Sequence, residues 1–301
     1  MIHPPQVAVD GSVAGTRRLG PRRLRTYRHD GLRFDLRDQG PLQGPVAVLL
    51  HGFPERASDW DAVASRLHTA GVRTIAPDQR GYSPGARPPT RASYRMSALV
   101  DDVVALVARI GGPVHLVGHD WGAAVAWRTA ADHPALVRTL TTVSVPHPAA
   151  FARSLLTSSQ LLRSWYVLAL QPPLVVETAA RLFPRLLAGP LRASGLDEAG
   201  VRRVEEQVLD YGALPGALGW YRAAPLDAFA TTSPVTVPTT HVWSTEEVAL
   251  SRRGAELTCR YVHAPFDLVT LEGVTHWAPQ QAPDRVADAV LSRIRGVTRT
   301  E

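Results

Sequence analysis

Residues 118–122, with the sequence GHDWG, have the types and spacing of a nucleophile elbow. A short apolar run at 114–117 precedes them, and an alanine-rich segment with good helix propensity follows. Strand, sharp turn and helix is the context in which an elbow projects its middle side chain above a sheet. The small residues Gly118 and Gly122 allow strand and helix to pack closely there. The middle residue is Asp120, so the candidate nucleophile is a carboxylate.

A carboxylate at this position implies different chemistry from a serine. A serine needs a base to remove its proton before it attacks an acyl carbon, whereas a carboxylate is already ionised near neutral pH. Asp120 is therefore suited to displacing a leaving group from an sp³ carbon and forming an alkyl ester. The alternative, from this stretch alone, is a turn aspartate between two glycines, which is a common feature of loops.

Strand-like and helix-like segments alternate through the first half of the chain and predict an α/β fold. The apolar run at 45–50 is typical of a central strand covered on both faces, so the sheet should be mostly parallel with helices on both sides. Asp30-Gly31 predicts a turn between the first two strands, Ser58 the N-cap of the first helix and Gly71 its end. The expected strands are 23–29, 32–38, 45–50, 72–76, 114–117 and 136–145, and the expected helices are 58–70, 97–110 and 123–131.

The pattern changes after the sequence PHP at 146–148. Residues 147–233 show helical segments without strand-like stretches and predict a helical cap over the C-terminal ends of the strands. Residues 1–146 and 234–301 are then the two parts of one α/β core, with a loose leader at 1–21. Alternating segments resume after the cap at 237–243, 250–260, 266–271 and 282–294.

Composition excludes several classes of function. The 301 residues are 45% hydrophobic and 20% charged, which suits one globular domain with an insertion. All 33 basic residues are arginines, spread without a basic helix or an RNA-binding motif, so nucleic acid is not an expected partner. Cys259 is the single cysteine, which fits a reducing cytoplasm and argues against a disulfide or a zinc cluster. No apolar run approaches the ~20 residues of a membrane span.

Seven stretches, in order along the chain, resemble the epoxide hydrolases of the α/β-hydrolase fold, with haloalkane dehalogenases as close cousins. The resemblance covers residues 22 to 297. The order of Asp120, an acid near 247 and His276 is also the nucleophile–acid–histidine order of that fold. The matching stretches are HGFPE at 51–55, DQRGYS at 78–83, GHDWGA at 118–123, SWYVLALQPP at 164–173, GWYRA at 219–223, VWSTEEVAL at 242–250 and GVTHWAP at 273–279.

The resemblance implies a catalytic triad. Asp120 is the nucleophile, His276 the base that activates water in the second step, and Glu247 the acid that orients His276. The family usually has Asp at the acid position, so Glu247 departs from the pattern. The neighbouring Glu246 leaves the choice between the two glutamates to the register of the motif.

The resemblance also implies how developing charge is stabilised. Tyr166 and Tyr221 match the paired cap tyrosines that hold and protonate an epoxide oxygen, and phenols with a pKa near ~10 are suitable donors. The alternative for both is packing in the core of the cap. The backbone N–H groups of Phe53 and Trp121 resemble an oxyanion hole. The expected contacts to an apolar or aromatic substrate are Phe53, Trp121, Trp165 and Trp220.

These roles predict a cytoplasmic enzyme, monomer or homodimer, that converts a small-molecule epoxide to a vicinal diol with no metal or organic cofactor. A dehalogenase with the same Asp–His machinery is the first alternative. Phe53 stands where the second side-chain N–H donor to a halide often lies, but phenylalanine has no such donor. Trp121 stands where fluoroacetate dehalogenases carry Arg. The two tyrosines, in contrast, favour the epoxide. The second alternative is a non-catalytic binding protein on the same fold.

Overall fold

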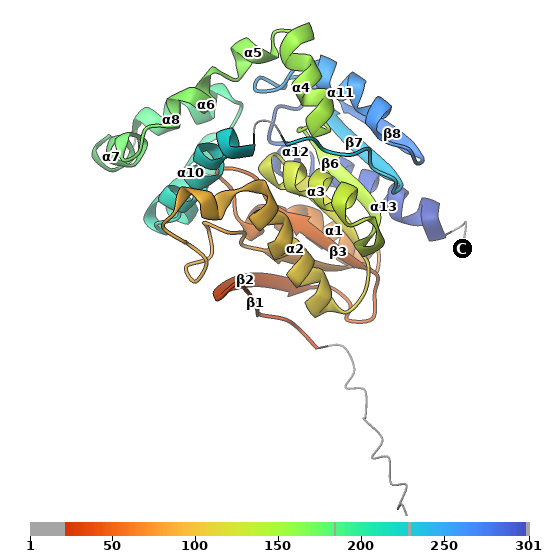
Figure 1. Cartoon of the computed structure of the whole chain (residues 1–301). Coiled ribbons are helices and arrows are strands. Elements are labelled where there is room, and N and C mark those ends of the chain that lie inside the picture. Colours follow the sequence, from red (N-terminus) through yellow and green to blue (C-terminus); the bar gives the residue numbers. More distant parts are fainter. Residues whose placement is uncertain (1–21, 184, 228–229, 299–301) are drawn as a thin grey trace, which may run out of the picture.

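One sheet of eight strands runs through the molecule in the order β1-β2-β4-β3-β5-β6-β7-β8 (Figure 1). The strands are β1 (Thr26–His29), β2 (Leu32–Gln39), β3 (Val46–Leu50), β4 (Arg73–Pro77), β5 (Val114–His119), β6 (Val137–Val143), β7 (Thr239–Ser244) and β8 (Phe266–Leu271). The structure is a computed structural model that describes residues 22–183, 185–227 and 230–298. The pairs β1–β2 and β2–β4 are antiparallel and the others parallel, which confirms the mostly parallel α/β sheet.

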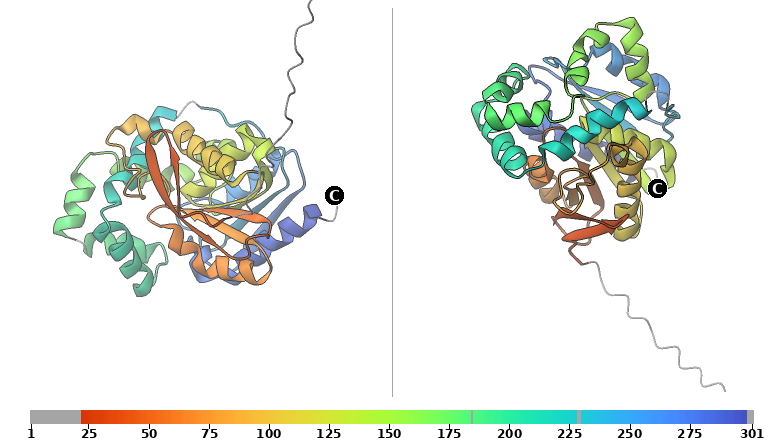
Figure 2. Two further views of the ribbon diagram at one scale, coloured as in Figure 1. Left: turned by 90° about the horizontal axis from the view of Figure 1, so that it is seen from below. Right: turned by 60° about the vertical axis from the view of Figure 1, so that its left-hand side comes forward.

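Alternate side chains of the central strands face opposite helical layers. Val48 and Leu50 of β3 belong to a hydrophobic cluster with helices α2 and α3, whereas Ala47 and Leu49 belong to a cluster with α1, α12 and α13. Helices therefore cover both faces of the sheet, as predicted (Figure 2). The helices of the core are α1 (Asp61–Thr69), α2 (Met96–Ile110), α3 (Trp121–Asp132), α11 (Arg252–Thr258), α12 (Ala278–Gln281) and α13 (Pro283–Thr298), with short helices η1 (Ala57–Trp60), η2 (Arg91–Tyr94), η3 (Pro134–Leu136) and η6 (Cys259–Tyr261).

Between β6 and β7, every regular element among the described residues of 147–233 is a helix, and no strand occurs there. In Figures 1 and 2 these helices form an arc above one end of the sheet. They are α4 (Pro148–Thr157), α5 (Gln160–Arg163), α6 (Trp165–Ala169), α7 (Val175–Leu182), α8 (Arg185–Ala193), α9 (Glu198–Val204), η4 (Glu205–Asp210), α10 (Leu214–Ala223) and η5 (Ala224–Asp227). We keep 147–233 as the proposed cap.

Local turn signals are mostly confirmed. Asp30 and Gly31 adopt φ values of 50° and 72°, as a tight turn between antiparallel strands requires, and Gly71, with φ 86°, follows α1. The predicted N-cap is wrong, because η1 begins at Ala57 and the hydroxyl of Ser58 donates to Gln207 of η4 instead. The side chain of Ser58 thus makes a long-range hydrogen bond to Gln207 in place of the capping hydrogen bond that the local sequence predicted.

The observed ends of the other predicted strands and helices mostly lie within a few residues of the predicted ends. Strand β8 begins and ends at the predicted residues. The predicted leader at 1–21 lies outside the described residues. Among the helices that the structure describes, none is long and apolar enough to cross a membrane.

Candidate active site

The elbow lies where β5 ends and α3 begins. Asp120 connects them with φ 50° and ψ −122°, a conformation that residues with a side chain rarely adopt. A Cβ atom on Gly118 would lie 2.3 Å from the carbonyl oxygen of Gly122, and one on Gly122 would lie 2.2 Å from that of Leu50. Both positions therefore require glycine, because backbone atoms occupy the space.

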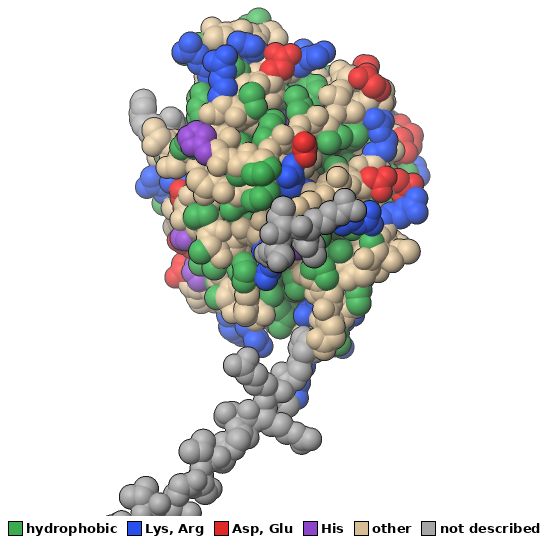
Figure 3. All heavy atoms as spheres, turned by 90° about the vertical axis from the view of Figure 1, so that its right-hand side faces the viewer, with side chains coloured by type: hydrophobic (Ala, Val, Ile, Leu, Met, Phe, Trp, Pro, Cys, Tyr) green, Lys and Arg blue, Asp and Glu red, His purple; other side chains and the backbone are tan. Residues whose placement is uncertain are grey.

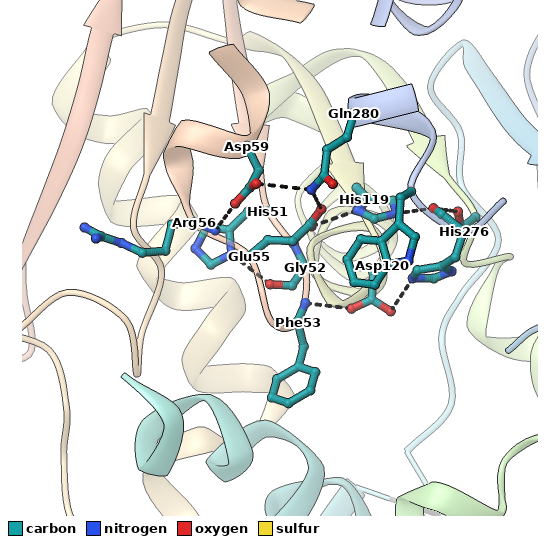
Figure 4. A network of polar contacts seen from close by, with 12 residues as sticks. His51, Gly52, Phe53, Glu55, Arg56, Asp59, His119, Asp120, His276 and Gln280 are labelled. Atoms are coloured by element: carbon teal, nitrogen blue, oxygen red, sulfur yellow. Dashed lines mark hydrogen bonds and ion pairs between the residues drawn. The ribbon is translucent and has the colours of Figure 1, made fainter. Parts of the chain in front are cut away.

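The carboxylate of Asp120 is buried and held on both oxygens. Its Oδ1 accepts a hydrogen bond of 2.8 Å from the backbone N–H of Phe53, and its Oδ2 lies 3.5 Å from Nε2 of His276 (Figure 4). Burial acts to raise the pKa of Asp120, but the hydrogen bond and the charge of His276 outweigh it and lower the pKa below the usual value. Asp120 is therefore ionised at neutral pH.

His276 lies between two carboxylates. Its Nδ1 is 2.7 Å from Oε2 of Glu247, while Oε1 of Glu247 accepts from the backbone N–H of Ala249 at 2.8 Å. Glu246 is exposed, and its backbone N–H donates to the carbonyl of Val274. The structure thus places Glu247, and not its neighbour, against the imidazole.

The charge of this pair follows from its surroundings. Burial acts to lower the pKa of His276, but Glu247 and Asp120 together raise it well above 6.5. The pKa of Glu247 is lowered despite burial, because the charge of His276 favours its ionised form. The resting site therefore holds an imidazolium between two carboxylates.

The two cap tyrosines meet above the elbow. Tyr166 of α6 and Tyr221 of α10 form a T-shaped pair with ring centroids 5.9 Å apart. The ring of Tyr221 also lies 5.0 Å from Phe53 and 5.1 Å from Trp121. Burial, with the nearby charge of Asp120 among the further causes, raises the pKa of both phenols. Both tyrosines therefore remain protonated and available as donors.

One of the two predicted oxyanion-hole donors contacts the carboxylate of Asp120. The amide of Phe53 already binds Oδ1 of Asp120. The amide of Trp121 stands at the N-terminus of α3, and within the described part of the chain no hydrogen bond joins it to the carboxylate. Its role as the second donor stays a prediction.

The two predicted substrate contacts that stand beside the tyrosines in the sequence have different surroundings. Trp165 is 67% exposed, and among the described residues no ring contact joins it to Tyr166, Tyr221 or Phe53. Trp220 is fully buried, and its indole N–H donates to the carbonyl of Arg80 at 2.8 Å. The sequence pattern identified aromatic residues beside the tyrosines but not the direction in which each points.

Trp121 and Trp220 border a cavity of about 250 Å³ between α3, α4 and the N-terminus of α2. Most of the remaining lining is apolar, including Tyr94, Met96 and Phe151. None of the three triad residues lines this cavity. It offers apolar volume next to the elbow.

Behind the triad lies a buried polar network that sequence reasoning missed. Nδ1 of His119 is 2.8 Å from Oε2 of Glu55, and Nε2 is 2.9 Å from the carbonyl oxygen of His276 (Figure 4). Both partners can only accept, so both ring nitrogens of His119 carry protons, and Glu55 raises its pKa against the effect of burial. The charge of this imidazolium is balanced by Glu55.

Gln280 extends this network to a second carboxyl group. Its Nε2 donates to Oε1 of Glu55 and to Oδ1 of Asp59, both at 3.1 Å. Burial and the neighbouring Glu55 raise the pKa of Asp59 to about 7. Glu55 belongs to the HGFPE motif and His119 precedes Asp120, so both residues were visible in the sequence. Their pairing could not be predicted, because they lie 64 positions apart in the chain. Among the described residues no group of three or more His, Cys, Asp or Glu side chains is placed to hold a metal ion.

Comparisons with known proteins agree with this architecture. The profile of the α/β-hydrolase fold family matches residues 45–241. The chain is 33% identical to an AB hydrolase superfamily protein, YfhM, of Bacillus subtilis, over 88% of this chain and 96% of that protein. It is 30% identical to human epoxide hydrolase 4, over 99% of this chain and 83% of that protein.

A solved structure gives the same result. The crystal structure of epoxide hydrolase A from Mycobacterium thermoresistibile superimposes with a TM-score of 0.76 and 26% identity, over 90% of this chain and 98% of that one. Sequence and structure therefore agree that this chain belongs to the α/β-hydrolase family, within its epoxide hydrolase group.

Proposed function

We propose that this epoxide hydrolase converts an apolar or aromatic epoxide to a vicinal diol through an alkyl ester on Asp120. The observation that carries the proposal is one arrangement: an ionised, buried carboxylate at the elbow, two protonated tyrosines above it, and the His276–Glu247 pair behind it. The names of the relatives support the reaction class, and the geometry supports the roles.

In the first step Oδ2 of Asp120 attacks an epoxide carbon. Oδ1 is held by the amide of Phe53, so the other oxygen is free to form the new C–O bond. The carbon–oxygen bond of the epoxide breaks, and its oxygen takes a proton from Tyr166 or Tyr221. Donors aimed at a developing alkoxide in a dry site lower the barrier most when they are already in place.

In the second step the proton that His276 carries in the resting enzyme first replaces the one that the tyrosine gave up. The neutral imidazole then accepts a proton from a water molecule, which attacks the acyl carbon of the ester. Oδ1 then becomes the oxyanion of the tetrahedral intermediate, and the amides of Phe53 and Trp121 are the donors for it. Collapse breaks the bond between the acyl carbon and the former Oδ2, which leaves with the diol after taking a proton from His276. The second proton of the water then passes to His276, which restores the imidazolium and leaves Asp120 as a carboxylate with one oxygen from water.

The two steps are coupled through the charge on Asp120. In the resting enzyme Asp120 and Glu247 together raise the pKa of His276. Ester formation neutralises Asp120 and removes its part of this effect, so the pKa of His276 falls. The imidazole therefore becomes a competent base when the ester is present and a base is needed.

The substrate class follows from the surroundings of the elbow. Phe53, Trp121 and the rings of the two tyrosines leave few polar side chains for a hydrophilic substrate to contact. The apolar cavity beside Trp121 adds volume for a ring or an alkyl chain. We propose no metal or organic cofactor for the reaction, and a monomer or homodimer as the working form.

The experiment combines a substrate panel with a trapped intermediate. Purified enzyme is offered aryl and alkyl epoxides with diol as the readout, and haloalkanes with halide as the readout. His276→Gln is then mixed with the best epoxide and its intact mass is measured. We expect diol without halide release, and one alkyl adduct that peptide mapping assigns to Asp120.

Asp120→Asn provides the matched control, because it keeps the shape of the side chain and removes the nucleophile. It should show neither turnover nor an adduct. Halide release in place of diol would favour the dehalogenase, and an adduct on another residue would refute the assignment of Asp120.

A further inference from the structure

An apolar surface covers the outside of the cap helices α4 to α7. Nine of the twelve large hydrophobic side chains that are exposed among the described residues lie within 156–183. Single exposed leucines are ordinary, but their concentration in one short segment indicates an interaction site. We call this the cap apolar surface. Its main residues, 58% to 83% exposed, are Leu156, Leu161, Leu162, Trp165, Leu168 and Phe183.

The cap apolar surface is one side of amphipathic helices. Leu161 lies on α5, and Trp165 and Leu168, three positions apart on α6, share one face of that helix. Tyr166, on another face of α6, is partly buried and contacts the ring of Tyr221. In Figure 1, α5, α6 and α7 lie along the outer margin of the molecule, with α8 beside them.

Within the segment that carries this surface, arginines outnumber carboxylates. Residues 148–183 contain three arginines and one carboxylate, Glu177, which is neutralised by two hydrogen bonds of 2.6 and 2.9 Å from Arg222. Arg153 and Arg181 are exposed. Basic side chains also lie at the top of the molecule in Figure 3, where α4 and α11 lie, with acidic side chains among them, as in the pairs of Arg252 and Arg253 with Glu256.

We propose that the cap apolar surface docks on an anionic lipid bilayer. The leucines and Phe183 would enter the boundary between headgroups and acyl chains, and Trp165 would lie at the headgroup level that tryptophan prefers. Arg153 and Arg181 would face lipid phosphates, each basic residue near such a surface adding attraction. A second copy of the chain is the poorer occupant, because a two-fold contact brings the same arginines toward one another.

Trp165 provides a direct readout. It is 67% exposed, whereas Trp60, Trp127, Trp220, Trp243 and Trp277 are at most 5% exposed and Trp121 is partly buried. The full chain is mixed with vesicles of phosphatidylglycerol and phosphatidylcholine whose acyl chains carry bromine, a quencher of tryptophan emission. We expect the protein to float with the vesicles and its emission to be quenched, and Trp165→Phe to lose the quenching.

Two double variants separate the apolar and the charged parts. Leu161→Ser with Leu168→Ser should weaken vesicle binding at least tenfold, whereas Leu268→Ser, an exposed leucine of β8, should have no effect. Arg153→Gln with Arg181→Gln should reduce binding to phosphatidylglycerol vesicles, and Arg109→Gln on α2 serves as its control. Added salt should weaken binding in the same way.

Several results would overturn the proposal. One is a protein that stays in solution with phosphatidylglycerol vesicles present. Another is equal binding to vesicles of phosphatidylcholine alone, or equal binding by the leucine double variant and the native chain. A dimer in sedimentation that the leucine double variant converts to monomer, without vesicle binding by the native chain, would assign the surface to a second copy instead. Turnover of a dissolved epoxide is measured separately and tests the proposed reaction.

Discussion

At the scale of single residues, the charge of His276 depends on two carboxylates with different roles. In the proposed reaction Asp120 forms an ester and loses its charge, whereas Glu247 keeps its charge throughout. The 2.7 Å contact between Nδ1 of His276 and Oε2 of Glu247 therefore persists when the 3.5 Å contact to Asp120 is lost. Glu247 alone then stabilises the imidazolium that forms during hydrolysis.

The first prediction concerns Glu247. Glu247→Gln removes a charge that raises the pKa of His276, so that pKa should fall. The acidic limb of the pH profile for ester hydrolysis should move to lower pH. Hydrolysis should slow far more than ester formation, because formation does not need His276 as a base. Rapid-mixing experiments that resolve the two steps between pH 5 and pH 9, roughly the range in which histidine titrates, would measure both effects.

Glu246→Gln is the matched control for this prediction. The side chain of Glu246 is exposed, and its backbone N–H bond to Val274 survives the change. It should behave as the native enzyme. If Glu246→Gln carried the defect instead, the acid of the triad would be the neighbouring residue.

The second prediction concerns the cap tyrosines. Tyr166→Phe and Tyr221→Phe each remove one donor to the developing alkoxide, which should slow ester formation about a hundredfold, or by about 3 kcal/mol. Because burial raises the pKa of both phenols, neither should produce an alkaline limb below about pH 10. Single-turnover alkylation of His276→Gln, with and without each Tyr→Phe change, measures the step. Alkylation at the unchanged rate in both would remove the main support for an epoxide substrate.

At the scale of elements, the elbow combines a strained residue with two close backbone contacts. The third prediction is that Gly122→Ala lowers the free energy of unfolding by at least about 2 kcal/mol, because its Cβ would lie 2.2 Å from the carbonyl oxygen of Leu50. Urea denaturation measures the change. Gly112→Ala is the control, because a Cβ there meets nothing within 4 Å. Equal stability of the two variants would show that the elbow tolerates a methyl group.

At the scale of the whole molecule, the proposed cap is fixed to the core near Tyr221. Helix α10, which carries Tyr221, approaches the loop after β4 so closely that a Cβ on Gly81 would lie 2.6 Å from the carbonyl oxygen of Gly216. At the other side, Nε2 of His147 lies 3.2 Å from the carbonyl oxygen of Ser233, joining both ends of the proposed cap. The position of Tyr221 thus depends on contacts between distant segments.

The fourth prediction concerns this docking. Trp220→Phe keeps an aromatic ring but removes the hydrogen bond to the carbonyl of Arg80, which then remains buried without its donor. We expect a lower melting temperature and slower ester formation through displacement of Tyr221. The ranking of epoxides by kcat/KM should remain unchanged. A changed ranking at an unchanged melting temperature would instead support direct contact between Trp220 and the substrate.

The sequence by itself determined the parts of this protein that depend on local patterns. The alternation of apolar strands and helices predicted the parallel sheet, because each strand must be covered on both faces. The elbow could be predicted from the sequence because the close approach of strand and helix requires glycine at both 118 and 122. The order of Asp120, Glu247 and His276, with two tyrosines between, identified the candidate site before any geometry was available.

Tertiary structure alone decided which side chains point into that site. Trp165 and Trp220 stand beside Tyr166 and Tyr221 in the sequence, yet Trp165 is exposed and Trp220 is buried against Arg80. The pairing of Glu55 with His119 was likewise invisible, because the pairing of distant segments determines a buried charge and its partner. Residue type is a property of the chain, whereas burial, direction and pKa are properties of the packing around it.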